Sequence, residues 1–91
     1  MLQTIERTTL TQLVTNEQYA RKVLPFMKKD YFTDRTERTI FEEITKFVDK
    51  YNKIPTQTSL EIEVQGRKDL NESDYKKVVA VIQTLSSTDV D

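Results

Sequence analysis

Apolar residues recur at helical spacing along most of this chain, and the clearest example lies between Asp30 and Pro55. Six of them fall within an arc of roughly 120° when residues are placed about 100° apart, as on one face of an α-helix. These are Ile40, Phe41, Ile44, Phe47, Val48 and Tyr51. Asp34 is well placed to accept hydrogen bonds from the first turn, with Glu37 completing a capping box. Because Pro55 disfavours helical geometry at the preceding residue, the pattern predicts one helix over residues 35–52.

Three further segments show the same periodicity. Residues 2–14 and 72–86 each predict an amphipathic helix, and the second begins after Asn71, a favourable N-cap residue. Residues 17–25 predict a shorter helix, which ends at a proline that lacks a backbone donor. Residues 87–91 are polar and poor in helix formers, so we expect them to begin a linker or to be the cut end of a longer protein.

Residues 58–65 carry two competing patterns. Alternation of apolar and polar residues, typical of a strand, is seen at Leu60, Ile62 and Val64. Thr58 followed by Glu61 fits a helical capping box, with Gly66 as the left-handed residue after the helix. A lone strand would leave its backbone groups unpaired, and no other segment offers it a partner. This comparison favours a helix over a strand.

Together these elements predict an all-α fold, a small single-core bundle of about five helices formed by residues 1–86. A chain of 91 residues can bury about 60–65% of its unfolded surface, which is enough for one core. Its net charge of −1 is far from the basic balance of a domain that holds nucleic acid through phosphate contacts. The longest apolar run, Val78 to Ile82, is too short to span a membrane, so no membrane association is expected.

The residue types that are missing exclude most enzyme chemistry. The chain contains no Cys and no His, which excludes zinc sites built on them, thiol nucleophiles and imidazole bases. The single glycine, Gly66, precedes Arg67 and Lys68 with no Ser or Thr after them, so it does not belong to a phosphate-binding P-loop. We therefore expect no enzyme activity, no cofactor, and no catalytic or metal-binding residue in this chain.

Two features of the predicted helices bear on function. The adjacent carboxylates Glu42 and Glu43 would do acid–base work only in a pocket, and the pattern of the central helix favours a solvated outward face. The last helix has an apolar arc of roughly 160°, wider than one contact requires. At its edge, Val81 and Leu85 either pack on the first and central helices or form an exposed interface with a partner protein.

Two short elements precede and start the central helix, namely Phe32-Thr33-Asp34 and Arg38-Thr39-Ile40-Phe41. Preceded by an amphipathic helix and followed by a Pro-Thr pair, they resemble the N-terminal domain of DnaB-family replicative helicases, above all those of T-even-like bacteriophages. The resemblance covers roughly residues 3–85. The bacterial pattern usually has a histidine where Thr36 or Glu37 stands and a Gly-Gly-x-x-Tyr-Leu element at 71–75, and both departures favour a phage lineage.

The resemblance implies a non-catalytic collar domain of a hexameric helicase, which serves ring assembly and docks the primase in the primosome. The implied partners are the primase and neighbouring helicase subunits, in the cytoplasm of the infected bacterial host. In that family a helical hairpin after this domain pairs the subunits, and it has no counterpart in this chain. The isolated domain is therefore expected to be monomeric or weakly self-associating.

Two other classes of function compete with this one. The first is a stand-alone phage adaptor that binds a host protein through the edge formed by Val81 and Leu85. The second is a helix-turn-helix domain that reads DNA. The outward face of the central helix carries Glu42, Glu43 and Asp49, whereas contacts with guanine and adenine in the major groove use Arg, Lys, Asn or Gln. Sequence-specific binding of nucleic acid is therefore not expected.

Overall fold

Helices make up all the regular structure in the described part of the chain. The computed structural model describes residues 5–85, apart from the side chain of Lys29. The α-helices are α1 (Ile5–Thr15), α2 (Glu17–Val23), α3 (Arg35–Tyr51), α4 (Gln57–Gln65) and α5 (Glu72–Thr84). Two 3₁₀ turns, η1 (Leu24–Phe26) and η2 (Lys29–Tyr31), connect α2 to α3. The predicted all-α fold of about five helices is confirmed, and residues 58–65 are helical.

The helix ends differ from the predicted ones in detail. Residues 2–4 and 86–91 lie outside the described residues, so the predicted start of the first helix and the predicted linker stay predictions. The second and last helices end at Val23 and Thr84, each two residues earlier than predicted. Thr56, rather than the expected Thr58, caps α4, because its extended backbone lets its Oγ1 accept a hydrogen bond from the Ser59 N–H. The left-handed residue expected after α4 is wrong as well, since Gly66 has a φ of −80°.

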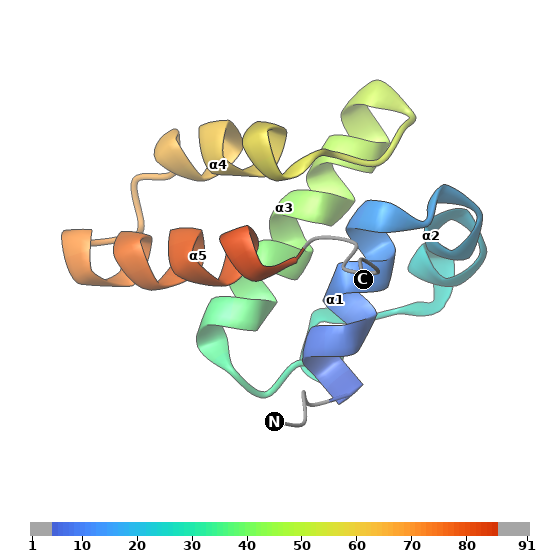
Figure 1. Ribbon diagram of the computed structural model, residues 1–91, viewed down its shortest axis with the longest axis horizontal. Helices are drawn as coiled ribbons and strands as arrows, with labels where there is room; N and C mark the ends of the chain where they lie inside the picture. The colour runs from blue at the N-terminus through green and yellow to red at the C-terminus, as the bar shows by residue number, and fades with distance from the viewer. Residues whose placement is uncertain (1–4, 86–91) are drawn as a thin grey trace.

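The helix α3 runs through the middle of the domain and organises the packing of the others. Figure 1 shows α1 and α2 on one side of α3, and α4 and α5 on the other. The last two helices run antiparallel and pack against each other as well as against α3. Because α3 touches α1, α4 and α5, its wide apolar arc is covered from several directions.

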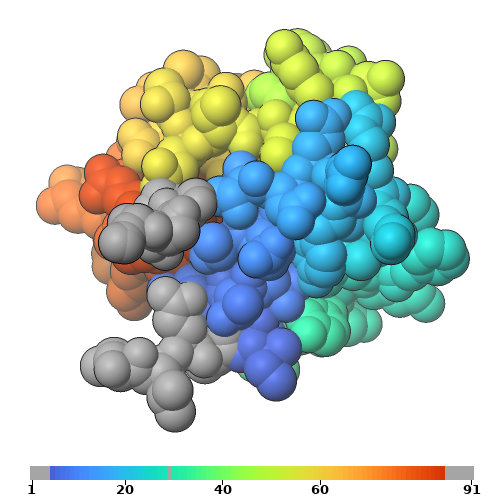
Figure 2. Space-filling view, turned by 45° about the vertical axis from the view of Figure 1, so that its right-hand side comes forward, coloured from blue at the N-terminus to red at the C-terminus, as the bar shows by residue number. Residues whose placement is uncertain are grey.

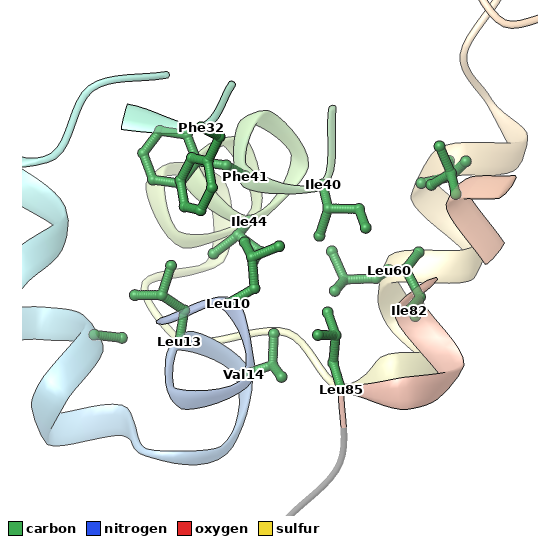
Figure 3. Close-up of a cluster of buried hydrophobic side chains, with 13 residues drawn as sticks. Leu10, Leu13, Val14, Phe32, Ile40, Phe41, Ile44, Leu60, Ile82 and Leu85 are labelled. Carbon is green, nitrogen blue, oxygen red and sulfur yellow. The ribbon is translucent and has the colours of Figure 1, made fainter. Parts of the chain in front are cut away.

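The core joins side chains from α1, α3, α4 and α5 in a single cluster (Figure 3). Phe32 has no exposed surface and packs its ring 5.0 Å, between centroids, from the ring of Phe41. Its neighbour Tyr31 lies edge-on to Phe32 but is 46% exposed, so only one of the two adjacent aromatics anchors the turn before α3. The other buried apolar residues are Leu10, Leu13, Val14, Ala20, Ile40, Ile44, Leu60, Val64, Val78, Ile82 and Leu85.

The start of α3 is held by side chains as well as by backbone. The Asp34 carboxylate accepts a hydrogen bond from the Glu37 N–H at 3.0 Å, which confirms the predicted N-cap. Glu37 forms an ion pair with Arg7 of α1 instead of the expected reciprocal contact to the cap residue. Arg7 reaches Glu37 because both side chains lie at the packed boundary between α1 and α3, where the carboxylate is only 8% exposed.

Asn52, at the C-terminal end of α3, gives a first testable expectation. Its φ of 58° and ψ of 34° place it in the left-handed region, and its N–H donates to the Val48 carbonyl. Asn52→Ala should lower the free energy of unfolding by about 1 kcal/mol, because a Cβ without a polar tip is strained in this conformation. Thermal denaturation followed by circular dichroism measures the change. Asn52→Gly is the matched control, since glycine adopts this geometry freely, and an equal loss in both variants would contradict the explanation.

Candidate interaction surface

The edge of α5, where a partner contact was considered, is mostly inside the domain. Leu85 has no exposed surface and belongs to the core cluster together with Val14 and Leu60 (Figure 3). Of the two alternatives for Leu85, the structure shows the one in which its side chain packs inside the domain. Val81 is half-buried and packs against the same core. The wide apolar arc is covered mainly by α3 and α4. The edge therefore packs internally, with α4 in the place that the sequence analysis gave to the first helix.

Glu43 is also buried, contrary to the solvated position expected from the helix pattern. Its side chain is 1% exposed, and the Arg67 guanidinium donates to it through Nη1 at 2.7 Å. The Lys46 ammonium approaches the same carboxylate oxygen at 3.4 Å. The segment that follows α4 covers Glu43, and a buried carboxylate needs a cation of this kind to offset its lost hydration.

Arg67 is the centre of a cluster of three carboxylates. Besides Glu43, it binds Asp69 through Nε and Nη2, at 2.9 and 2.7 Å, and Nη2 lies 3.4 Å from Glu42. The hydrogen bonds from Arg67 lower the pKa of Asp69 to about 2, and the bond from Asp69 helps to raise the pKa of Arg67 above its usual range. Arg67 thus forms ion pairs with all three carboxylates. The cluster therefore fixes the α4–α5 connection to α3.

No metal site or membrane-spanning element arises from the described residues. In residues 5–85, the acidic side chains do not gather in any group of three or more that could hold a metal ion. None of the helices in this range combines the length and the apolar character needed to cross a membrane.

Among residues 5–85, Phe26 is the most exposed large apolar side chain, at 84%. It lies in η1, which forms because Pro25 lacks an N–H and cannot continue α2 in regular α-helical hydrogen bonding. The Met27 N–H then donates to the Leu24 carbonyl at 3.2 Å, and Met27 turns into an extended conformation. This tight turn holds Phe26 away from the core while Met27 packs against it.

The residues of η1 line two shallow grooves, one through Phe26 and the other through Leu24 and Pro25, and η1 is here called the ridge between them. The first, here called the Tyr19 groove, has a volume of about 580 Å³. It is lined by Thr9, Tyr19, Val23, Phe26, Met27, Lys28, Asp30 and Tyr31. The second, here called the Val48 groove, has a volume of about 400 Å³. It is lined by Ala20, Arg21, Leu24, Pro25, Thr45, Val48 and Asp49. The chain that follows α2, coloured teal, forms an outer edge of the molecule in Figure 2.

The ridge and grooves are the candidate interaction surface of the described residues. Apolar and aromatic groups dominate the walls, and single exposed apolar residues become informative when they gather at one place. The sequence analysis did not single out Phe26, because the sequence pattern next to a helix end is the same whether a phenylalanine there is buried or exposed. The only available signal was its position directly after a helix-ending proline.

Comparison with known protein families shows which family this chain is related to over nearly its whole length. The sequence profile of the DnaB-like helicase N terminal domain matches residues 2–90. The chain belongs to this family. It is also similar to the DnaB-like replicative helicase of Enterobacteria phage T4, with 26% identity over 82 residues. That alignment covers 90% of the chain and 17% of the T4 protein, so the chain spans about a sixth of the length of this relative.

Within this DnaB-like domain, the short motifs that carried the resemblance build the start of α3. Phe32 is buried in the core and Asp34 is the N-cap. Arg38 donates through Nε to the Phe32 carbonyl at 3.2 Å, which ties the first element to the second. Ile40 and Phe41 are core residues. The DnaB-like motifs therefore specify the fold, and the exposed surface at η1 lies outside them.

Proposed function

We propose that this DnaB-like domain is the N-terminal collar of a bacteriophage replicative helicase, where it serves ring assembly and docking of the primase. The domain acts through protein contacts in the cytoplasm of the infected host and not through catalysis. The family match over residues 2–90 carries the proposal, and the exposed apolar surface at η1 supports it. Residues 87–91 would then start the linker to the rest of the helicase.

Deletion of residues 1–86 from the full-length helicase tests this function. We expect the variant to retain DNA-stimulated ATP hydrolysis, to form hexamers at higher protein concentration than the complete protein, and to lose stimulation by primase. Native mass spectrometry measures the oligomer, and an unwinding assay with and without the cognate primase measures the coupling. Unchanged ring formation together with unchanged primase stimulation would contradict the proposal.

The adaptor alternative predicts a different result in a direct binding assay. Isothermal titration of the 91-residue chain with the cognate primase should give a saturable heat, whereas titration with duplex DNA should give none. Binding of a host protein without binding to the primase or to other helicase subunits would favour an adaptor. Tight, sequence-selective binding to duplex DNA would favour the helix-turn-helix class.

A further inference from the structure

We propose that Gln57 and Leu85 hold the end of α5 in place and thereby fix the point and the direction in which the chain leaves the domain. The two residues are here called the exit clamp. The inference rests on the proposed function and deepens it, because a collar acts on the rest of a helicase through the segment that follows it. Gln57 is a positioning residue in this role, since it acts on that segment through the end of α5.

The first helix and the last helix are held differently at their outer ends. Ile5, in the first turn of α1, is 73% exposed. Leu85, directly after α5, has no exposed surface and lies in the core with Val14 and Leu60 (Figure 3). Helix ends ordinarily fray, because the carbonyls of the last turn lack partners within the helix. A fully buried residue just past that turn joins the end of α5 to side chains of α1 and α4.

The Ile82 carbonyl provides the second connection, because it accepts two hydrogen bonds. One comes from the Leu85 N–H at 3.0 Å and closes the last turn of α5. The other comes from Gln57 Nε2 at 2.8 Å, although Gln57 lies twenty-five positions earlier in the chain. Because Ile82 has no exposed surface, its carbonyl depends on protein donors of this kind.

Gln57 is placed at this carbonyl by the segment that joins α3 to α4. Pro55 is fully buried, and the Thr56 side chain caps α4 by accepting a hydrogen bond from the Ser59 N–H. Gln57 follows this cap directly as the first residue of α4. Since α4 and α5 run antiparallel and pack together, the start of α4 lies beside the end of α5 (Figure 1). The Gln57 amide therefore relates the end of α5 to a backbone segment that is itself fixed.

The hydrogen bond from Gln57 does what bonds within α5 cannot do. Thr84 Oγ1 donates to the Val81 carbonyl at 2.6 Å, but this bond stays within the last turn and moves with it. The bond from Gln57 crosses from one helix to another. It therefore holds the end of α5 in one orientation relative to α4.

The exit clamp also sets the length of the connection to whatever follows. A helical residue spans about 1.5 Å along the axis, whereas an extended residue spans up to about 3.3–3.6 Å. Loss of the last turn of α5 would therefore lengthen the connection as well as loosen it. A longer flexible linker lowers the effective concentration of one attached part near the other. By keeping the exit closed, the clamp should couple the collar to the remaining parts of a helicase.

Backbone order parameters from NMR relaxation of the 91-residue chain test the clamp. The Leu85 amide of the unmodified chain should have the value of a rigid backbone, about 0.85. Gln57→Leu removes the amide donor at similar side-chain volume. It should lower the values at residues 83–85 toward the flexible range, about 0.6 and below, and leave the middle of α3 unchanged. A change in overall stability alone would not produce this local effect.

Gln65→Leu is the matched control, since it makes the same substitution at an exposed site of the same helix. It should leave the order parameters of residues 83–85 as they are in the unmodified chain. Low order at Leu85 before any substitution, or an equal effect of the two variants, would overturn the proposal.

The same two substitutions in the full-length helicase test the consequence of the clamp. Gln57→Leu should leave hexamer formation and binding of the primase unchanged. It should reduce the stimulation of unwinding by primase about twofold or more, because the connection becomes longer and looser. Gln65→Leu should change none of these. Full stimulation in the Gln57→Leu helicase would show that Gln57 does not act as a positioning residue.

These outcomes are separable from those of the proposed function. If the full-length helicase assembles and responds to primase without residues 1–86, the collar function fails, whatever the order parameters of the isolated chain show. If that deletion has its expected effects and Gln57→Leu has none, the collar function stands and the exit clamp is wrong.

Discussion

Arg67→Met should lower the free energy of unfolding by about 3 kcal/mol, because it leaves the Glu43 carboxylate buried without its principal partner. The Glu43 side chain is 1% exposed, and in this variant its remaining cationic partner is the Lys46 ammonium, at 3.4 Å. Lys46 is itself 69% exposed, so it compensates the buried charge incompletely and keeps the loss near the low end of the range for broken buried pairs. In a domain of this length, each kcal/mol of lost stability lowers the melting temperature by about 4–8 °C.

Urea denaturation followed by circular dichroism measures the effect of Arg67→Met, and two companion variants define its origin. Glu43→Gln should cost only about 1 kcal/mol, because Arg67 keeps Asp69 and the amide oxygen still accepts a hydrogen bond. The double variant Arg67→Met with Glu43→Leu should return close to the unmodified stability, since apolar side chains can replace a buried ion pair. Losses that simply add in the double variant would show that the pair is not coupled.

The second large effect is expected at Phe32, the buried aromatic beside the start of α3. Phe32→Ala should cost about 3–5 kcal/mol, because it removes a fully buried ring from between η2 and α3 and leaves a cavity. A domain of this length has a total stability of roughly 5–14 kcal/mol. The variant should therefore lose a large share of its stability and unfold at a much lower urea concentration.

Phe26→Ala is the matched control, because the same residue type is removed from an exposed site six positions earlier in the sequence. Its free energy of unfolding should change by no more than about 0.5 kcal/mol. Urea denaturation of both variants in parallel makes the comparison direct. Similar losses in the two would contradict the assignment of Phe32 to the core and of Phe26 to the surface.

The apolar pattern predicted the helices well because periodicity depends only on local spacing. The six apolar positions of α3 were found in this way, and three of them, Ile40, Phe41 and Ile44, are buried. The N-caps at Asp34 and Asn71 were also predictable, since the bonded groups lie within one turn of the cap. In contrast, the reciprocal contact expected of Glu37 was replaced by an ion pair with Arg7, thirty positions away.

Long-range pairing explains most of what the sequence did not reveal. Glu43 lies just outside the apolar arc of α3, and only the segment after α4 covers it and provides Arg67, twenty-four positions later. Leu85 was placed at an outer edge because the pattern of a single helix does not show that a second helix covers the same side. Phe26 is the opposite case. Composition alone gave no reason to expect a phenylalanine at the surface.

The segment that presents Phe26 has less internal support than the central helix. Ala20 is the only fully buried residue of α2, and η1 has none, whereas α3 contributes several residues to the core. Opening of this segment is therefore expected to cost much less free energy than global unfolding. A partner that binds only the closed form would protect its backbone amides and raise the apparent stability of the whole domain. Binding of such a partner at the ridge would thus be thermodynamically linked to the folding of α2.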